Sequence, residues 1–206
     1  AETTRWMLAI NQIEFENVTI ETPQDLADLR ASGKLPFDQM PLLEINGLNL
    51  SQSTAMIRYL ARLGDLYGDS DTDAVWCDMI AGAVADFAEA SMQAAFQATG
   101  NIAKAVLRTR FSKFGPRFEA RLASNGTGFC AGSGLTFADV VLVEALSSYL
   151  DWCPDILADT PKLDALYKRV IAEPGIANYL TSAQRHLIAG DQYVLCKGRK
   201  SNRSSR

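Results

Sequence analysis

Residues 42–50 constrain the fold of this chain more than any other segment. They hold two short apolar runs, Leu-Leu-Glu-Ile and Leu-Asn-Leu, joined by Asn46-Gly47. Asn-Gly supplies the two positive φ angles that a tight two-residue turn requires. The sequence therefore predicts a β-hairpin over this segment.

Helix signals lie on both sides of the hairpin. Residues 3–11 carry apolar side chains at helical spacing, and residues 22–25 read Thr-Pro-Gln-Asp. A threonine N-cap, a proline at the first helical position and an acid at the third are a strong helix start. Gly33 is a natural end for that helix. A third helix opens at residues 51–53, and the β-prone residues 14–20 predict a strand between the first two helices.

The sequence changes in texture after Gly68. Residues 69–73 read as a linker that caps a long helix, and the chain beyond shows helical patterns, with clear starts at Thr136 and Thr160. We predict three parts. Residues 1–68 form a first domain, residues 69–190 form an all-helical domain, and residues 191–206 form a basic, disordered tail.

Charge and hydropathy argue against two classes of partner. The net charge of the chain is −4, and its last ten residues carry five basic side chains and no acid, so the rest is more acidic still. An acidic body argues against nucleic-acid binding. No apolar run reaches the roughly 18 residues that span a bilayer, so we expect no membrane insertion.

Cysteine and histidine usage bears on metals and on compartment. The four cysteines are widely spaced with no Cys-x-x-Cys pair, and the chain has one histidine. This pattern indicates neither a disulfide framework nor a zinc site, so we expect no metal. Cysteines of this kind behave as small buried hydrophobes in a reducing compartment. We therefore expect a cytoplasmic protein.

Three motifs follow one another in a specific order. The first reads Leu-Arg-Ala-Ser-Gly-Lys-Leu-Pro-Phe-Asp-Gln-Met-Pro over residues 29–41 and leads into the hairpin. The second reads Leu-Ser-Gln-Ser-Thr-Ala-Met-Ile-Arg-Tyr-Leu over residues 50–60, and the third reads Leu-Thr-Phe-Ala-Asp over residues 135–139. Together they resemble the cytosolic glutathione transferases, especially the tyrosine-type alpha, mu, pi and sigma classes.

This resemblance implies a fold of two domains. The first is an α+β, thioredoxin-like N-terminal domain, and the second is an all-α, helical C-terminal domain. The predicted strand at residues 14–20 follows a helix, and a strand–helix–strand crossover needs an earlier strand. We therefore expect the first strand of the thioredoxin-like domain to lie upstream of Ala1, so that the first domain as written lacks it.

The resemblance also implies a site for glutathione as substrate. Ser53 opens a helix, so its hydroxyl and backbone N–H can hold the γ-glutamyl carboxylate, an anion suited to a helix N-terminus. Gln52 would bond the same moiety. The alternative is that Ser51 or Ser53 only caps the helix.

The segment before the hairpin would bind the rest of glutathione. Met40-Pro41 resembles the family's cis-proline turn, in which the Met40 backbone pairs with the cysteinyl part, and Gln39 precedes it in the same motif. An ordinary trans loop is the alternative. Arg30 matches an arginine that grips the glycyl carboxylate, and Lys34 would assist it. Taken alone, either cation is a solvated charge at a helix end.

Four further positions are implied in the helical domain. Asp86 matches an acid that a neighbouring subunit contributes to the glutathione amine, and the family resemblance implies a homodimer. Met92 and Phe96 would wall a pocket for apolar electrophiles, although such residues are more often core. Asp139 would be structural, returning a hydrogen bond to the start of its own helix.

The catalytic residue is not assigned within the chain. In the tyrosine-type classes the catalytic tyrosine lies on the first strand, so we expect it upstream of Ala1. Tyr59 and Tyr67 follow the glutathione motif and do not replace it. A free thiol titrates near 8.5, so a donor must stabilise the glutathione thiolate at neutral pH.

The implied function is that of a detoxifying glutathione transferase, which conjugates the glutathione thiol to apolar electrophiles. Two alternatives remain open. One is a non-catalytic glutathione-binding or crystallin-like structural relative, and the other is a sigma-type prostaglandin isomerase. The residue on the absent first strand distinguishes an enzyme from a binding protein.

Overall fold

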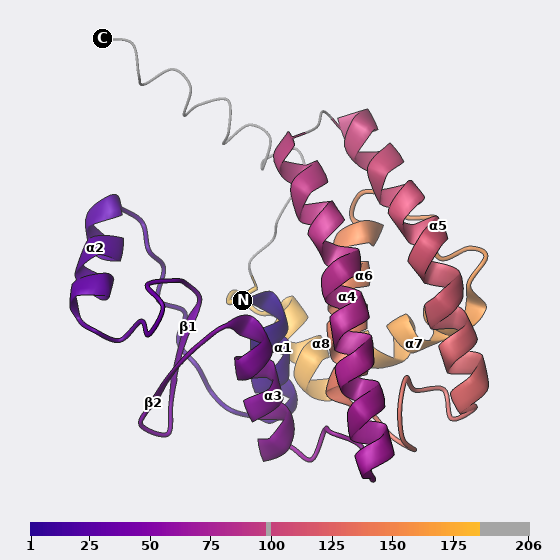
Figure 1. The fold of residues 1–206 in the computed structure, drawn as a ribbon, viewed down its shortest axis with the longest axis horizontal. Helices are drawn as coiled ribbons and strands as arrows, with labels where there is room; N and C mark the ends of the chain where they lie inside the picture. Colours follow the sequence, from indigo (N-terminus) through magenta and orange to yellow (C-terminus); the bar gives the residue numbers. More distant parts are fainter. Residues whose placement is uncertain (98–99, 186–206) are drawn as a thin grey trace. The chain divides into compact units, whose positions relative to one another are not determined.

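The computed structural model describes residues 1–97 and 100–185, apart from the side chains of residues 90–97. These residues form two compact units (Figure 1). The first combines Ala1–Tyr67 with Glu173–Arg185, and the second is Gly68–Ala172. The predicted tail at 191–206 lies outside the described residues. In the part of the chain that is described, no helix is both long enough and apolar enough to cross a bilayer.

The first unit is built from both ends of the described chain. Its elements are α1 (Glu2–Ile10), α2 (Pro23–Ala31), β1 (Leu42–Ile45), β2 (Leu48–Ser51), α3 (Ser53–Leu63) and α8 (Pro174–Thr181). Helix α1 packs against α3 and α8. The largest side chains of this core are at most 1% exposed: Trp6, Met7, Met56, Leu60 and Ile176.

Glu2 links the first and the last helix of this unit. One of its carboxylate oxygens accepts a hydrogen bond from the hydroxyl of Tyr179 on α8, at 2.9 Å, and an ion pair from Arg5 at 3.1 Å. The other oxygen accepts from the indole N–H of Trp6 at 3.2 Å. The α1–α8 contact is therefore polar at its edge and apolar at its centre.

The predicted β-hairpin is confirmed. Strands β1 and β2 pair antiparallel, with Leu43 opposite Leu50 and Ile45 opposite Leu48. Asn46 and Gly47 form the turn with φ angles of 51° and 76°. Directly opposed residues share a face of the sheet, so these four apolar side chains cover one side of the hairpin.

The predicted start of α2 is also confirmed. The Thr22 side chain accepts from the Asp25 backbone N–H at 3.1 Å, and the Asp25 carboxylate accepts from the Thr22 N–H at 2.8 Å. Pro23 follows as the first helical residue. The segment after the helix turns at Gly33, whose φ is 72°.

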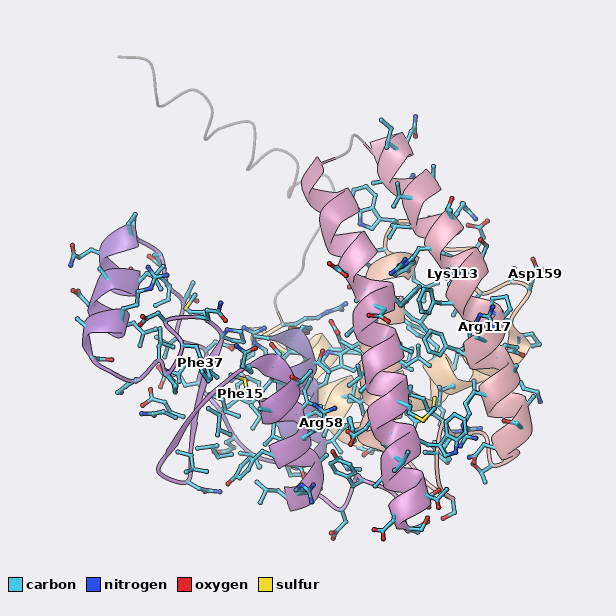
Figure 2. All side chains as sticks on the ribbon, viewed as in Figure 1. Phe15, Phe37, Arg58, Lys113, Arg117 and Asp159 are labelled. Atoms are coloured by element: carbon cyan, nitrogen blue, oxygen red, sulfur yellow. The ribbon has the colours of Figure 1, made fainter. Side chains whose placement is uncertain are left out.

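The predicted strand at residues 14–20 is wrong. This segment belongs to no helix or strand among the described residues, and Val18 is 81% exposed. Side chains hold it instead of a ladder. Gln184 donates to the Phe15 carbonyl at 3.3 Å, and the Phe15 ring, labelled in Figure 2, meets Tyr179 at a centroid distance of 6.1 Å. A β-prone run forms a strand only where a neighbour supplies its hydrogen bonds.

The second unit is helical, as predicted for this part of the chain. It contains α4 (Asp71–Gln97), α5 (Gly100–Asn125), α6 (Phe137–Leu150) and α7 (Pro161–Ile171). Helix α4 lies beside α5 and α6, and α7 contacts both α5 and α6 (Figure 1). The fully buried Phe87 lies at the centre of this core and stacks on Tyr149 at a centroid distance of 4.2 Å.

A buried capping box starts α6, as the motif at residues 136–139 predicts. The fully buried Asp139 carboxylate accepts from the Thr136 N–H and hydroxyl, both at 2.8 Å. It also accepts from the Cys130 N–H at 2.6 Å. Burial raises the pKa of the Asp139 carboxyl, and these donors oppose that rise. The box therefore fixes both the helix start and the loop that leads to it.

Three cysteines of the described chain, Cys77, Cys130 and Cys153, are buried free thiols. Burial raises the pKa of the Cys77 thiol to about 11 and raises the pKa of the Cys130 thiol well above its ordinary value. Thiols in this state are poor nucleophiles. Both belong to the packing of the second unit.

Candidate functional site

The candidate site begins where β2 passes into α3. Gln52 is the N-cap of α3, with φ 69° and ψ 109°, and its side chain is exposed. A positive φ at a residue other than glycine costs free energy and is concentrated at functional sites. Ser53 follows as the first, half-buried residue of α3. The free backbone N–H groups of this helix end favour an anion.

The loop before β1 lies against this helix start. The Gln52 amide donates to the Gln39 side-chain oxygen at 3.0 Å. The next residues, Met40 and Pro41, are joined by a cis peptide bond, as the resemblance implies. Met40 is 49% exposed. The structure therefore brings Gln39, Met40, Gln52 and Ser53 into one exposed region of the first unit.

Arg30 is tied to the same loop. It lies in the last turn of α2, and its side chain donates to the Asp38 backbone carbonyl at 3.2 Å. This hydrogen bond holds the exposed guanidinium of Arg30 next to Asp38, which lies two residues before Met40. Phe37 of the same loop, labelled in Figure 2, is 64% exposed.

Lys34 is paired away from this cluster. Its ammonium group forms an ion pair of 2.7 Å with the Glu44 carboxylate on β1, and both side chains are about half exposed. Exposed pairs of this kind are weak and exchange readily. Lys34 is thus held near β1 without being locked there.

Asp86 lies on α4, in the second unit, and its side chain is exposed. Its backbone carbonyl accepts a hydrogen bond from the Arg110 guanidinium, which also lies over the Phe114 ring at 4.8 Å from the centroid. No sequence pattern predicts this contact, because it depends on the packing of α5 beside α4.

Two predicted pocket residues stay untested. Met92 and Phe96 belong to the C-terminal part of α4, but their side chains lie outside the described residues. Among the side chains that are described, no cluster of His, Cys, Asp and Glu is suited to hold a metal ion.

Comparison with known proteins decides the family. Residues 1–62 match the glutathione S-transferase N-terminal domain, and residues 85–183 match the glutathione S-transferase C-terminal domain. The chain is 32% identical over 203 residues to glutathione S-transferase alpha-2 of Rattus norvegicus, covering 97% of this chain and 91% of that protein. The chain belongs to the glutathione S-transferase family.

Other relatives support the same family assignment. Glutathione S-transferase A2 of Bos taurus is 36% identical over 183 residues, covering 87% of this chain and 82% of that protein. The crystal structure of the glutathione S-transferase from Ascaris lumbricoides superposes with a TM-score of 0.73 at 26% identity, covering 91% of this chain and 93% of that one. The resemblance read from three sequence motifs is confirmed. The chain has a thioredoxin-like N-terminal domain with a small sheet, followed by a helical C-terminal domain.

Proposed function

We propose that this chain binds glutathione at the start of α3 and along the loop that precedes β1, and that the protein conjugates the glutathione thiol to apolar electrophiles. The observation that carries the proposal is the hydrogen bond between Gln52 and Gln39. It joins a helix N-terminus suited to a carboxylate to an exposed loop in which Met40 precedes the cis-linked Pro41.

The chemistry of glutathione matches this arrangement part by part. Its γ-glutamyl carboxylate would lie at the Ser53 hydroxyl and the N–H groups of α3, with Gln52 beside it. Its cysteinyl backbone would pair with Met40. Its glycyl carboxylate would meet Arg30, and Lys34 would move from Glu44 to assist, because an exposed ion pair exchanges at little cost.

Catalysis needs a donor that favours the thiolate, because a free thiol titrates near 8.5. We assign this role to none of the described residues. Met92 and Phe96 are proposed as walls of the electrophile pocket. A conjugation assay with glutathione and an apolar electrophile tests the reaction. Glutathione binding without turnover would favour a non-catalytic binding protein instead.

Replacing Ser53 with alanine tests the binding site. We expect glutathione affinity to fall about tenfold, the scale of one lost hydrogen bond to a charged group. Isothermal titration calorimetry measures the change, and Thr54→Ala, at the exposed next position of the same helix, serves as the control with unchanged affinity. Equal affinities for both variants would remove Ser53 from the site.

We further propose a cytoplasmic homodimer in which Asp86 completes the glutathione site of the partner subunit by binding the glutathione amine. The support is the exposure of the Asp86 side chain. Analytical ultracentrifugation at micromolar concentration should show a dimer. A monomer that binds glutathione with full affinity would refute this assignment.

A further inference from the structure

Two Asn-Gly pairs occur in the chain, at residues 46–47 and 125–126. This dipeptide is chemically special, because glycine has no side chain to shield its backbone nitrogen from the amide of the preceding asparagine. We propose that Asn46 is a site of spontaneous deamidation in the folded protein, and that the fold protects Asn125 from the same reaction.

The reaction balances with water as the only co-reactant. The Gly47 backbone nitrogen attacks Cγ of Asn46 and loses its proton, the bond from Cγ to Nδ2 breaks, and ammonia leaves. Water then opens the resulting cyclic imide. Hydrolysis at Cγ gives an aspartyl linkage, and hydrolysis at the backbone carbonyl gives an isoaspartyl linkage whose main chain runs through Cγ.

The turn at Asn46 leaves the reacting groups accessible. Both residues of the turn are exposed, and the space where a Gly47 side chain would project is open for at least 4 Å. Within the described residues, the Gly47 N–H takes part in no hydrogen bond of the hairpin ladder, which pairs Ile45 with Leu48. The Asn46 amide has one restraint, a hydrogen bond of 3.0 Å that it donates to the Tyr59 hydroxyl.

At Asn125, in contrast, the reacting groups are restrained by several hydrogen bonds. Its half-buried amide nitrogen donates to the Thr127 hydroxyl at 2.7 Å and to the carbonyls of Phe129 and Gly132, both at 3.0 Å. Its side-chain oxygen accepts from Arg121 at 3.2 Å. The Gly126 N–H is also engaged, because it donates to the Leu122 carbonyl at 3.1 Å as α5 ends.

Deamidation at Asn46 would alter the hairpin. An isoaspartyl linkage adds one carbon to the main chain of a two-residue turn, and turn length fixes the register of the strands. It also adds a carboxylate beside Tyr59. Strand β2 leads directly into Gln52, so the change would weaken glutathione binding over time. This last step rests on the proposed function, whereas the reaction itself does not.

The test is a timed incubation of the folded chain at mildly alkaline pH, followed by peptide mapping with mass spectrometry. Each hydrogen bond that must open before the ring closes slows the reaction by about fivefold. With both N–H hydrogens of its amide and the Gly126 N–H engaged, Asn125 should convert on the order of a hundredfold more slowly than a free Asn-Gly peptide. In the folded chain Asn46 should convert much faster than Asn125. In denaturant the two positions should convert at similar rates.

Two variants sharpen the result. Tyr59→Phe removes the restraint on the Asn46 amide and should accelerate conversion there only. Asn46→Gly keeps a turn of the required type without an amide, so hydrogen exchange of the β1–β2 amides should stay constant with age in this variant and rise in the parent chain. Conversion at position 46 no faster than at position 125 in the folded chain would overturn the proposal.

Discussion

Replacing Asp139 with alanine is expected to lower the free energy of unfolding of the helical unit by about 4 kcal/mol. The carboxylate is fully buried and accepts hydrogen bonds from the Thr136 N–H, the Thr136 hydroxyl and the Cys130 N–H. Alanine would leave these donors without an acceptor in a place that water does not reach. Buried donors that lose their partner each cost about 1–3 kcal/mol, offset in part by no longer burying a carboxylate.

Urea unfolding followed by circular dichroism measures this loss. Asp164→Ala is the matched control, because Asp164 is also an acid in the first turn of a helix but forms only an exposed ion pair with Lys168. Its removal should change the free energy of unfolding by less than about 0.5 kcal/mol. Similar losses in the two variants would show that burial of Asp139 contributes nothing beyond an ordinary helix-start charge.

Replacing Phe87 with alanine is expected to cost about 4 kcal/mol, within the range for phenylalanine in a protein core. Phe87 is fully buried and stacks on Tyr149, with an angle of 15° between the rings. Rings of Phe111, Phe114 and Phe118 lie within 6.5 Å of it. Alanine would leave a cavity that these aromatic side chains are too rigid to fill.

Urea unfolding again gives the magnitude, and near-ultraviolet circular dichroism should lose signal as the Tyr149 ring loses its neighbour. Val75→Ala on the same helix is the control, because Val75 is 57% exposed. It should change the free energy of unfolding by less than about 0.5 kcal/mol. A Phe87→Ala variant as stable as this control would contradict the assignment of Phe87 to the centre of the core.

Local signals in the sequence predicted much of the fold. The start of α2 at Thr22, the turn at Asn46 and the start of α6 at Thr136 are all confirmed. Each depends on side chains within four positions of one another, so the residues that form the structure are neighbours in the sequence. Helix caps and two-residue turns are decided at this range.

The strand at residues 14–20 failed because its hydrogen bonds depend on a partner that the segment itself cannot specify. The burial of apolar side chains along a helix depends on distant partners in the same way. Val75 and Met79 follow helical spacing, which predicts α4, but both are more than half exposed. Spacing identifies a helix, whereas tertiary packing decides how much of its apolar face is covered.

The candidate site was named from resemblance to a family rather than from pattern. The contact of Gln39 with Gln52 joins a loop to a helix start across the hairpin, and no periodicity predicts it. Side-chain contacts over such distances follow from the path of the backbone. The contact of Arg110 with Asp86 was not predicted for the same reason, because only the packing of α5 beside α4 brings the two residues together.

The first unit is discontinuous in sequence, and this has a consequence for synthesis on the ribosome. Helix α8, which supplies Ile176 and Tyr179 to the core around α1, is translated only after the whole of the second unit. At about 5–20 residues per second, the intervening hundred or so residues take roughly 5–20 s to add. Throughout that interval the nascent α1 has exposed apolar surface that α8 later covers. The second unit already has its whole sequence available before α8 is made.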